Sequence, residues 1–374
     1  MKKILVINPG STSTKLAIYE NMKLVNEVNL KLDEEFARAH YMVMEQAEHR
    51  TELILNFMKD NGYKVEDFDI IAARGGWLPP CGGGVYAVNQ LMLDVLTYAP
   101  LGQHASSLGA VIGTNLAQGR IPVIICDSVS TDELRPMAKM TGMPGVTREP
   151  AYHVLNTRYA AKEVAEKRGI PFEKGRFIVV HMGGGSSILA YEDGKLVDFD
   201  NDVVTPQRSG RMPFPYKDLV AKCFSGEYTQ QQITKMLMGE GGFYLYTGTQ
   251  DALSVEKKAL AGDETCQKLY ELMAYQLNKC IGEMYAALDY KVDALIITGA
   301  LAKSPLLIEP LKKTYEGVLS MEIIPGEREL EALAKAACDV LSGKEIAKEY
   351  DVLPKGMKTV EEFYDFVAAE KAQK

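Results

Sequence analysis

The sequence predicts an α/β protein built from two duplicated domains, and three observations lead to this fold class. The segment I-N-P-G-S-T-S-T-K at residues 7–15 joins two short strand-like runs. The segment V-H-M-G-G-G-S-S at 180–187 repeats that arrangement about half a chain later. Further apolar strands end at Asp127 and at Gly299, in comparable places of the two halves. With 374 residues, the chain is long enough for two domains that each have a full core.

Each repeated segment predicts a β-hairpin with a Gly/Ser/Thr tip. Backbone N–H groups and hydroxyls at such a tip form a nest of donors that suits an anion such as phosphate. In a Walker loop or a dinucleotide fingerprint, by contrast, the glycines lead into a helix. Taken alone, the first tip is also compatible with a simple well-capped turn. The expected phosphate-binding residues are Asn8, Gly10, Ser11, Thr12, Ser13, Thr14, Lys15, Gly183, Gly184 and Gly185.

The composition excludes several classes of protein. The net charge of −8 argues against broad binding to nucleic acid or to an anionic membrane, although a local cationic site stays compatible with it. No stretch approaches the roughly 20 apolar residues that span a membrane, and the apolar run after Lys3 is too short for a signal peptide. The six cysteines lack zinc or disulfide spacing, and we expect Cys126 and Cys280 to be core thiols. A reduced, cytoplasmic enzyme is the expected class.

Periodicity and turn residues then predict the elements along the chain. Helices are expected over 34–60, 104–118, 152–167, 329–350 and 358–374, and strands over 70–73, 121–126 and 295–298. The Gly/Pro-rich stretch 75–84 and the segment 240–250 read as loops. Because glycines and prolines concentrate at 135–150, we place the domain junction there. The first domain is expected to hold 1–148 with a return of about 331–374, and the second to hold 149–330.

Several charged residues end strands or border glycines, where a side chain can reach a ligand. His181 precedes three glycines, so a functional histidine is favoured over a structural one. Arg74 ends a strand at a double glycine, and Arg208 lies in T-P-Q-R-S-G, with Arg211 as its competitor. A guanidinium fork matches carboxylate and phosphate geometry, whereas most arginines are only solvated surface residues.

Carboxylates at two places could serve a metal ion. Asp127 stands at the carboxyl end of a strand, where it could hold a metal or water, or else cap the following turn. Glu327 and Glu329 lie in P-G-E-R-E-L, where carboxylates most often just begin a helix. The residues alone do not choose between these readings.

Longer strings resemble the butyrate kinases, in the acetokinase family of the actin, sugar kinase and heat-shock ATPase superfamily. The resemblance covers about residues 3–350 and rests on I-N-P-G-S-T-S-T-K, A-R-G-G-W-L-P-P-C-G-G-G-V-Y, A-P-L-G-Q-H-A-S-S-L-G-A, V-H-M-G-G-G-S-S, P-Q-R-S-G, V-D-A-L-I-I-T-G and P-G-E-R-E-L-E-A-L-A. It implies two duplicated domains of the actin-like ATPase (ribonuclease H-like) fold with an interdomain nucleotide cleft. It also implies reversible transfer of the ATP γ-phosphoryl group to a short-chain carboxylic acid, and a homodimer or higher homo-oligomer.

The resemblance also implies roles for individual residues. Arg74 and Arg208 would hold the acyl carboxylate and the phosphoryl group, and His181 would stabilise the equatorial oxygens. Asp127 and Glu329, with Glu327 as the alternative to Glu329, would serve Mg²⁺ and its waters. Gly299 would line the adenosine pocket, and the first hairpin would contact phosphates. A carboxylate acceptor is already ionised at neutral pH, so this chemistry needs no general base.

Departures from the family pattern shape the expected substrate. Gly102 stands where acetate kinases carry a histidine, which favours the butyrate branch and argues against acetate, but does not choose among butyrate, propionate and a branched acid such as isobutyrate. Gln207 and the short segment before it alter the surroundings of Arg208, and the tail after residue 352 has no counterpart. Rival readings are a sugar kinase with Asp127 as base and a non-catalytic, nucleotide-responsive module of the same fold.

Overall fold

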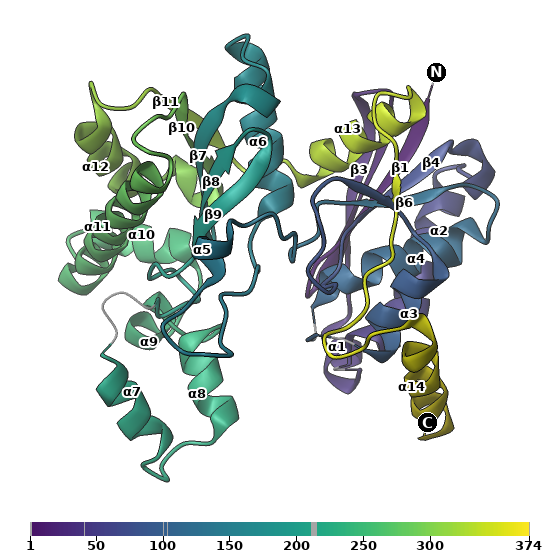
Figure 1. The fold of residues 1–374 in the computed structure, drawn as a ribbon, viewed down its shortest axis with the longest axis horizontal. Helices are drawn as coiled ribbons and strands as arrows, with labels where there is room; N and C mark the ends of the chain where they lie inside the picture. The colour runs from purple at the N-terminus through teal and green to yellow at the C-terminus, as the bar shows by residue number, and fades with distance from the viewer. Residues whose placement is uncertain (1, 41, 100, 103, 211–214, 374) are drawn as a thin grey trace. The chain divides into compact units, whose positions relative to one another are not determined.

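The computed structural model describes residues 2–40, 42–99, 101–102, 104–210 and 215–373. Within these residues the chain forms two compact units, each built on its own β-sheet (Figure 1). The first unit comprises Met1–Glu133, Glu149–Leu155 and Arg328–Lys374, and the second comprises Leu134–Arg148 and Asn156–Glu327.

The segment Leu134–Arg148, which the sequence analysis places in the first domain, belongs to the second unit. Two contacts explain this. The Arg135 backbone N–H donates to the Val197 carbonyl at 3.0 Å, and an Arg148 Nη1 lies 3.2 Å from an Asp198 carboxylate oxygen.

The first unit contains a seven-stranded sheet in the order β12-β5-β6-β4-β1-β2-β3. Its strands are β1 (Lys3–Pro9), β2 (Ser13–Glu20), β3 (Lys23–Lys31), β4 (Ile70–Arg74), β5 (Val85–Ala87), β6 (Val123–Cys126) and β12 (Lys348–Glu349). Its helices include α1 (Glu34–Ala39), α2 (Ala47–Asp60), α3 (Gln90–Tyr98), α4 (Leu108–Ala117), α13 (Glu329–Leu341) and α14 (Val360–Gln373). The parallel central strands β1 and β4 are apolar and buried almost throughout, as expected of strands covered on both faces.

The second unit contains a five-stranded sheet in the order β11-β10-β7-β8-β9. Its strands are β7 (Arg176–Met182), β8 (Ser186–Glu192), β9 (Lys195–Asp200), β10 (Ala294–Gly299) and β11 (Met321–Pro325). Its helices are α5 (Pro136–Lys139), α6 (Val154–Lys167), α7 (Tyr216–Cys223), α8 (Gln230–Leu237), α9 (Phe243–Thr247), α10 (Ala252–Leu260), α11 (Glu264–Ala287) and α12 (Pro305–Tyr315). The first two residues of α6, Val154 and Leu155, belong to the first unit, and the rest of the helix belongs to the second.

Strand order and register confirm the predicted duplication. Five strands of the first sheet, β3-β2-β1-β4-β6, match β9-β8-β7-β10-β11 of the second in order and direction. Both sheets even carry a register shift at the same place, between Ile18 and Tyr19 and between Ala190 and Tyr191. The two glycine-containing hairpins, β1–β2 and β7–β8, are therefore equivalent elements.

Several predicted elements are shorter or more broken than the sequence suggested. The helix expected over 34–60 is divided into α1, a 3₁₀ turn at Val43–Gln46 and α2. The helix expected over 329–350 ends at Leu341 and is followed by β12, while the expected loop 240–250 contains the short helix α9. The tail that had no counterpart forms α14, whose Phe363 and Val367 are buried in the core of the first unit.

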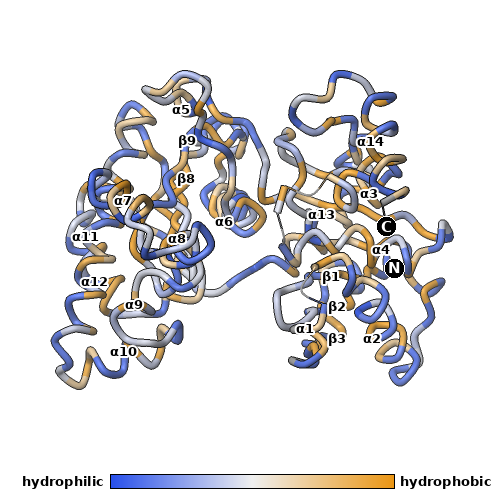
Figure 2. Tube along the Cα trace, turned by 90° about the horizontal axis from the view of Figure 1, so that it is seen from below, coloured by the Kyte–Doolittle hydropathy of each residue, from blue (hydrophilic) through white to orange (hydrophobic). Residues whose placement is uncertain are grey.

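Each unit has its own hydrophobic core. In the first, α4 packs on the sheet face that carries Leu5, Ile7 and Ile71, and α2 packs against α4. In the second, α11 covers the face that carries Ile178 and Val180. Figure 2 shows hydrophobic stretches along the strands and alternating hydrophobic and hydrophilic turns in the outer helices. None of the described helices is both long and apolar enough to cross a membrane.

Candidate functional site

In the first unit, Asn8, Arg74 and Glu329 form a connected polar cluster. An Arg74 Nη2 lies 3.0 Å from Glu329 Oε1, and Asn8 Nδ2 donates to Glu329 Oε2 at 2.8 Å. A longer bond of 3.5 Å joins Arg74 Nη1 to Asn8 Oδ1. Asn8 and Glu329 are buried, whereas 18% of the Arg74 side chain is exposed. The guanidinium is thus fixed in orientation and still reaches the surface.

The fold explains why these three residues meet. Asn8 and Arg74 stand at the ends of β1 and β4, which pair in parallel through Ile7 and Ala73. Glu329 is the first residue of α13, which packs on β1 and β4. A carboxylate at a helix N-terminus is also favoured by the helix dipole.

The structure separates the two glutamates that the sequence left as alternatives. Glu329 is buried against Asn8 and Arg74, whereas Glu327 is exposed and belongs to the second unit. Although the two glutamates lie two residues apart in the chain, it is Glu329, the first residue of α13, that joins the cluster.

Asp127 directly follows β6 and has a left-handed backbone conformation, with φ of +43°. Its Oδ1 accepts the Gly84 N–H at 2.8 Å, and its own N–H donates to the Gly84 carbonyl at 3.1 Å. The carboxylate thus ties the end of β6 to the glycine-rich loop. A non-glycine residue held at positive φ is uncommon and is often found at functional sites.

The tip of the first hairpin is a tight turn in which Gly10 N–H donates to the Ser13 carbonyl at 2.7 Å. Ser11, Thr12 and Lys15 are exposed, while Thr14 is buried. Ser13 and Thr14 begin β2, so the hydroxyl-rich segment lies at the edge where β1 and β4 end.

In the second unit, His181 occupies the place that Asn8 has in the first. It lies one residue before the end of β7, is 1% exposed, and pairs across the parallel strands with Thr298 of β10. Asn156 Nδ2 lies 2.9 Å from His181 Nδ1 and donates to Thr298 Oγ1 at 3.3 Å. With Nδ1 accepting from the amide, the neutral ring carries its proton on Nε2.

The glycines of the second hairpin allow close packing. A Cβ on Gly184 would lie 2.8 Å from Gln207 Cδ. The Gly184 carbonyl accepts from the Thr205 hydroxyl at 2.6 Å and from the Gln207 N–H at 3.2 Å. Gly183 N–H donates to the Gly185 carbonyl at 2.9 Å, which closes the tip.

Gly299 is required by backbone geometry. Its φ is +92°, and an added Cβ would lie 2.3 Å from the Met182 carbonyl oxygen. This places the end of β10 against the end of β7, next to the second hairpin.

Arg208 is half-buried, and burial lowers the pKa of its guanidinium from the usual value. Its backbone is fixed by bonds to Thr205, but its guanidinium has no hydrogen bond or ion pair within the described residues. Such a group is suited to receive an anion. Its competitor Arg211 lies outside the described residues.

The aromatic rings of Trp77 and His104 form a second feature of the first unit, beside Arg74. The Trp77 and His104 rings meet edge to face with centroids 6.4 Å apart. Burial, and secondly the charge of Arg74, lower the pKa of His104. A Cβ on Gly102 would lie 3.0 Å from the Trp77 ring, so Trp77 fills the space that a larger side chain would need.

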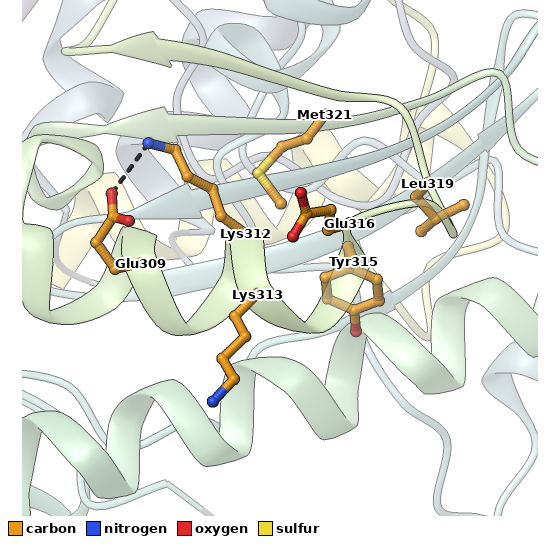
Figure 3. A pocket seen from close by; sticks show the side chains of 7 residues that line it. All are labelled: Glu309, Lys312, Lys313, Tyr315, Glu316, Leu319 and Met321. Atoms are coloured by element: carbon orange, nitrogen blue, oxygen red, sulfur yellow. Dashed lines mark hydrogen bonds and ion pairs between the residues drawn. The ribbon is translucent and has the colours of Figure 1, made fainter.

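A surface cavity of about 450 Å³ lies elsewhere, along α12 and the start of β11 (Figure 3). Lys312, Lys313 and Tyr315 are among its lining residues, and Lys312 pairs with Glu309 at 3.0 Å. None of the predicted site residues lines it. In the described part of the chain, no group of three or more His, Cys, Asp and Glu side chains could hold a metal ion by itself.

Sequence reasoning missed two buried residues that hold the site. Asn156 orients His181, and Arg50 of α2 is 1% exposed behind the first hairpin. A lone arginine among polar helix residues looks like a solvated surface group, and no local signal marks it otherwise. The position of Asn156 at the start of a helix does not indicate that its partner is His181, 25 residues later in the chain.

Comparisons with known proteins identify the family of this chain. A sequence model of the acetokinase family matches residues 137–330. The chain is 41% identical to a probable butyrate kinase of Clostridium botulinum and 40% identical to butyrate kinase 2 of Clostridium acetobutylicum, in each case over 93% of this chain and 99% of the relative. The acetate kinase structure from Porphyromonas gingivalis superposes with a TM-score of 0.73 at 19% identity, covering 92% of this chain and all of that one. This likeness shows the predicted actin-like two-domain fold, and the sequence relatives show that the chain belongs to the acetokinase family.

Proposed function

We propose that this protein transfers the γ-phosphoryl group of ATP to a short-chain fatty acid, butyrate or a branched acid such as isobutyrate, and so forms the acyl phosphate and ADP reversibly. The relatives named butyrate kinase align over nearly their whole length, which supports this substrate class. The observation that most directly supports this proposal is the Arg74 guanidinium, which is held by Glu329 and Asn8 and is partly exposed at the end of β4.

The reaction requires no proton transfer from the acceptor, but it requires that the negative charges of the two substrates be stabilised. The carboxylate acceptor is ionised at neutral pH, so no general base is needed. Two anions must be brought together, and positioned arginines and backbone donors supply the stabilisation that phosphoryl transfer uses. We assign the acyl carboxylate to Arg74 and the transferring phosphoryl group to Arg208.

His181 is assigned to the equatorial oxygens of that group. Because its Nδ1 accepts from Asn156, the neutral imidazole presents Nε2–H as a donor. A donor aimed at charge that develops only in the transition state contributes to kcat rather than to binding.

The residues also fit Mg²⁺ that arrives with the nucleotide. Magnesium usually keeps several waters and binds through one or two carboxylates together with substrate phosphates. We assign Asp127 and Glu329 to its water shell. Both oxygens of Glu329 already accept hydrogen bonds, but each carboxylate oxygen has two acceptor sites, so water can bind there as well.

The experiment that tests this function is hydroxylamine trapping of acyl phosphate, with ATP, Mg²⁺ and a panel of acids from acetate to hexanoate plus isobutyrate and isovalerate. We expect the highest kcat/KM for a four-carbon or branched acid. If turnover were highest on acetate, we would conclude that the substrate belongs to the acetate and propionate class. ATP binding without product from any acid would instead favour the nucleotide-responsive module.

Two controls sharpen the assay. An assay with glucose as the acceptor, in which ADP release is measured, distinguishes an acid kinase from a sugar kinase. The expected homodimer or higher homo-oligomer is a separate prediction from the resemblance, and sedimentation velocity tests it.

A further inference from the structure

We infer that Arg50 is a positioning residue that shapes the first hairpin into an anion-binding loop. This inference rests on the proposed function, because it names a residue that prepares the loop for nucleotide phosphates. Arg50 lies on α2, separated by some 40 residues from the hairpin that it contacts.

The guanidinium of Arg50 binds the inner side of the loop. Nη1 donates to the carbonyl oxygens of Gly10 at 3.0 Å and Ser13 at 3.1 Å, and to Thr14 Oγ1 at 3.0 Å. Nη2 donates to the Ser11 carbonyl at 3.2 Å. One side chain thus fixes most of the tip.

Gln46 in turn orients Arg50. Its Oε1 accepts from Nε at 3.2 Å and from Nη2 at 2.9 Å, while its own amide donates to the His40 carbonyl at 2.7 Å. Gln46 is itself buried. Gln46 therefore holds the guanidinium of Arg50 in an orientation in which it points at the loop of the first hairpin.

Drawing the loop carbonyls inward turns specific N–H groups outward. In a trans peptide the C=O and the following N–H point in opposite directions. The carbonyls of Gly10 and Ser11 face Arg50, so the N–H groups of Ser11 and Thr12 face away from it. Neither of these N–H groups has an acceptor in the described part of the chain, and both residues are exposed. Successive outward N–H groups form an anion-binding nest.

The charge of Arg50 favours an anion at the same place. All of its acceptors are neutral oxygens, and it has no ion pair within the described ranges. Burial lowers the pKa of its guanidinium, as expected of a cation taken out of water without a counter-ion. A phosphate bound at the outer face of the loop would supply the missing negative charge.

Lysine lacks the planar fork that binds several carbonyls at once, so Arg50→Lys keeps the charge and loses the geometry. We expect this variant to weaken ATP binding about 10- to 100-fold, the loss of one hydrogen bond to a charged group. Adenosine binding should stay within about twofold, since adenosine has no phosphate. In the protein without nucleotide, hydrogen–deuterium exchange of the peptide spanning residues 8–16 should be faster.

The matched control is Ile54→Ala, which removes a buried side chain from the same helix without touching the loop. It should lower stability yet leave ATP affinity within about twofold. Arg50→Met, which lacks the charge, provides a second variant if Arg50→Lys does not fold.

The outcomes separate this inference from the proposed function. Unchanged ATP affinity in the Arg50 variants, equal loss in Ile54→Ala, or equal loss for adenosine would each show that Arg50 is only structural. If the wild-type protein binds ATP but makes no acyl phosphate, the proposed function fails while the Arg50 comparison still decides the inference. If the wild-type protein does not bind ATP, both fail.

Discussion

Replacing Glu329 with glutamine should destabilise the first unit by about 2–4 kcal/mol. The side chain is 7% exposed, and its two oxygens bind different donors, Arg74 on one side and Asn8 on the other. Glutamine has nearly the same shape, so it tests charge and hydrogen bonding without leaving a cavity.

The magnitude follows from these contacts. Glutamine offers one oxygen and one NH₂, and the NH₂ must face either Arg74 or Asn8, which are both donors. One buried donor then lacks an acceptor, which costs about 1–3 kcal/mol. Loss of the negative charge next to Arg74 adds to this. Breaking a fully buried pair costs about 3–5 kcal/mol, and the 18% exposure of the Arg74 side chain reduces that figure.

The assay uses urea unfolding followed by tryptophan fluorescence. Trp77 is the only tryptophan of the chain and lies in the first unit, so its signal reports on the unit that contains Glu329. With a slope of about 2 kcal/mol per molar urea, the midpoint should fall by about 1–2 M.

The control is Glu331→Gln on the same helix. Glu331 lies 3.2 Å from Arg328, and 36% of its side chain is exposed, so its removal should cost no more than about 1 kcal/mol. If both variants shift the midpoint equally, the Glu329 cluster does not stabilise the first unit and the reasoning is refuted.

Three further predictions concern both units. Arg208→Ala should lower kcat by about 10³–10⁵-fold, as for arginines that stabilise phosphoryl transfer, and near-wild-type turnover in folded protein would remove Arg208 from the mechanism. Gly299→Ala should destabilise the protein by more than about 1 kcal/mol, because its φ is +92° and the Met182 carbonyl blocks a Cβ; an unchanged melting temperature would contradict this. The pKa of His104 is lowered by burial, so the unfolded chain takes up the proton first, at its ordinary pKa of about 6.5. Stability should therefore fall as pH drops below about 6.5, and urea midpoints in His104→Gln should depend less on pH.

The duplicated hairpins could be predicted from the sequence because they are local. A Gly/Ser/Thr segment between two apolar runs specifies a turn whatever the rest of the chain does. The strands that end at Arg74 and at Gly299 were found in the same way, and parallel pairing then placed each beside its hairpin.

Predictions that depended on partners were less complete. The helix expected over 329–350 ends at Leu341, just before Gly343 turns the chain with a φ of +73°, and Lys348 and Glu349 pair with β5 instead of continuing the helix. The segment Leu134–Arg148 joins the second unit through contacts with β9 that no local pattern encodes.

The sequence by itself determined the fold class, the two hairpins and the strand-end residues, since these follow from turn chemistry and hydrophobic periodicity over a few residues. The tertiary structure alone decided that Glu329 rather than Glu327 meets Arg74, that Asn156 orients His181, and that Arg50 binds the hairpin. The partners in these pairs are separated by 25 residues, for Asn156 and His181, to 255 residues, for Arg74 and Glu329. A buried polar group is stable only where the folded chain supplies its partner, and no short window of sequence contains both.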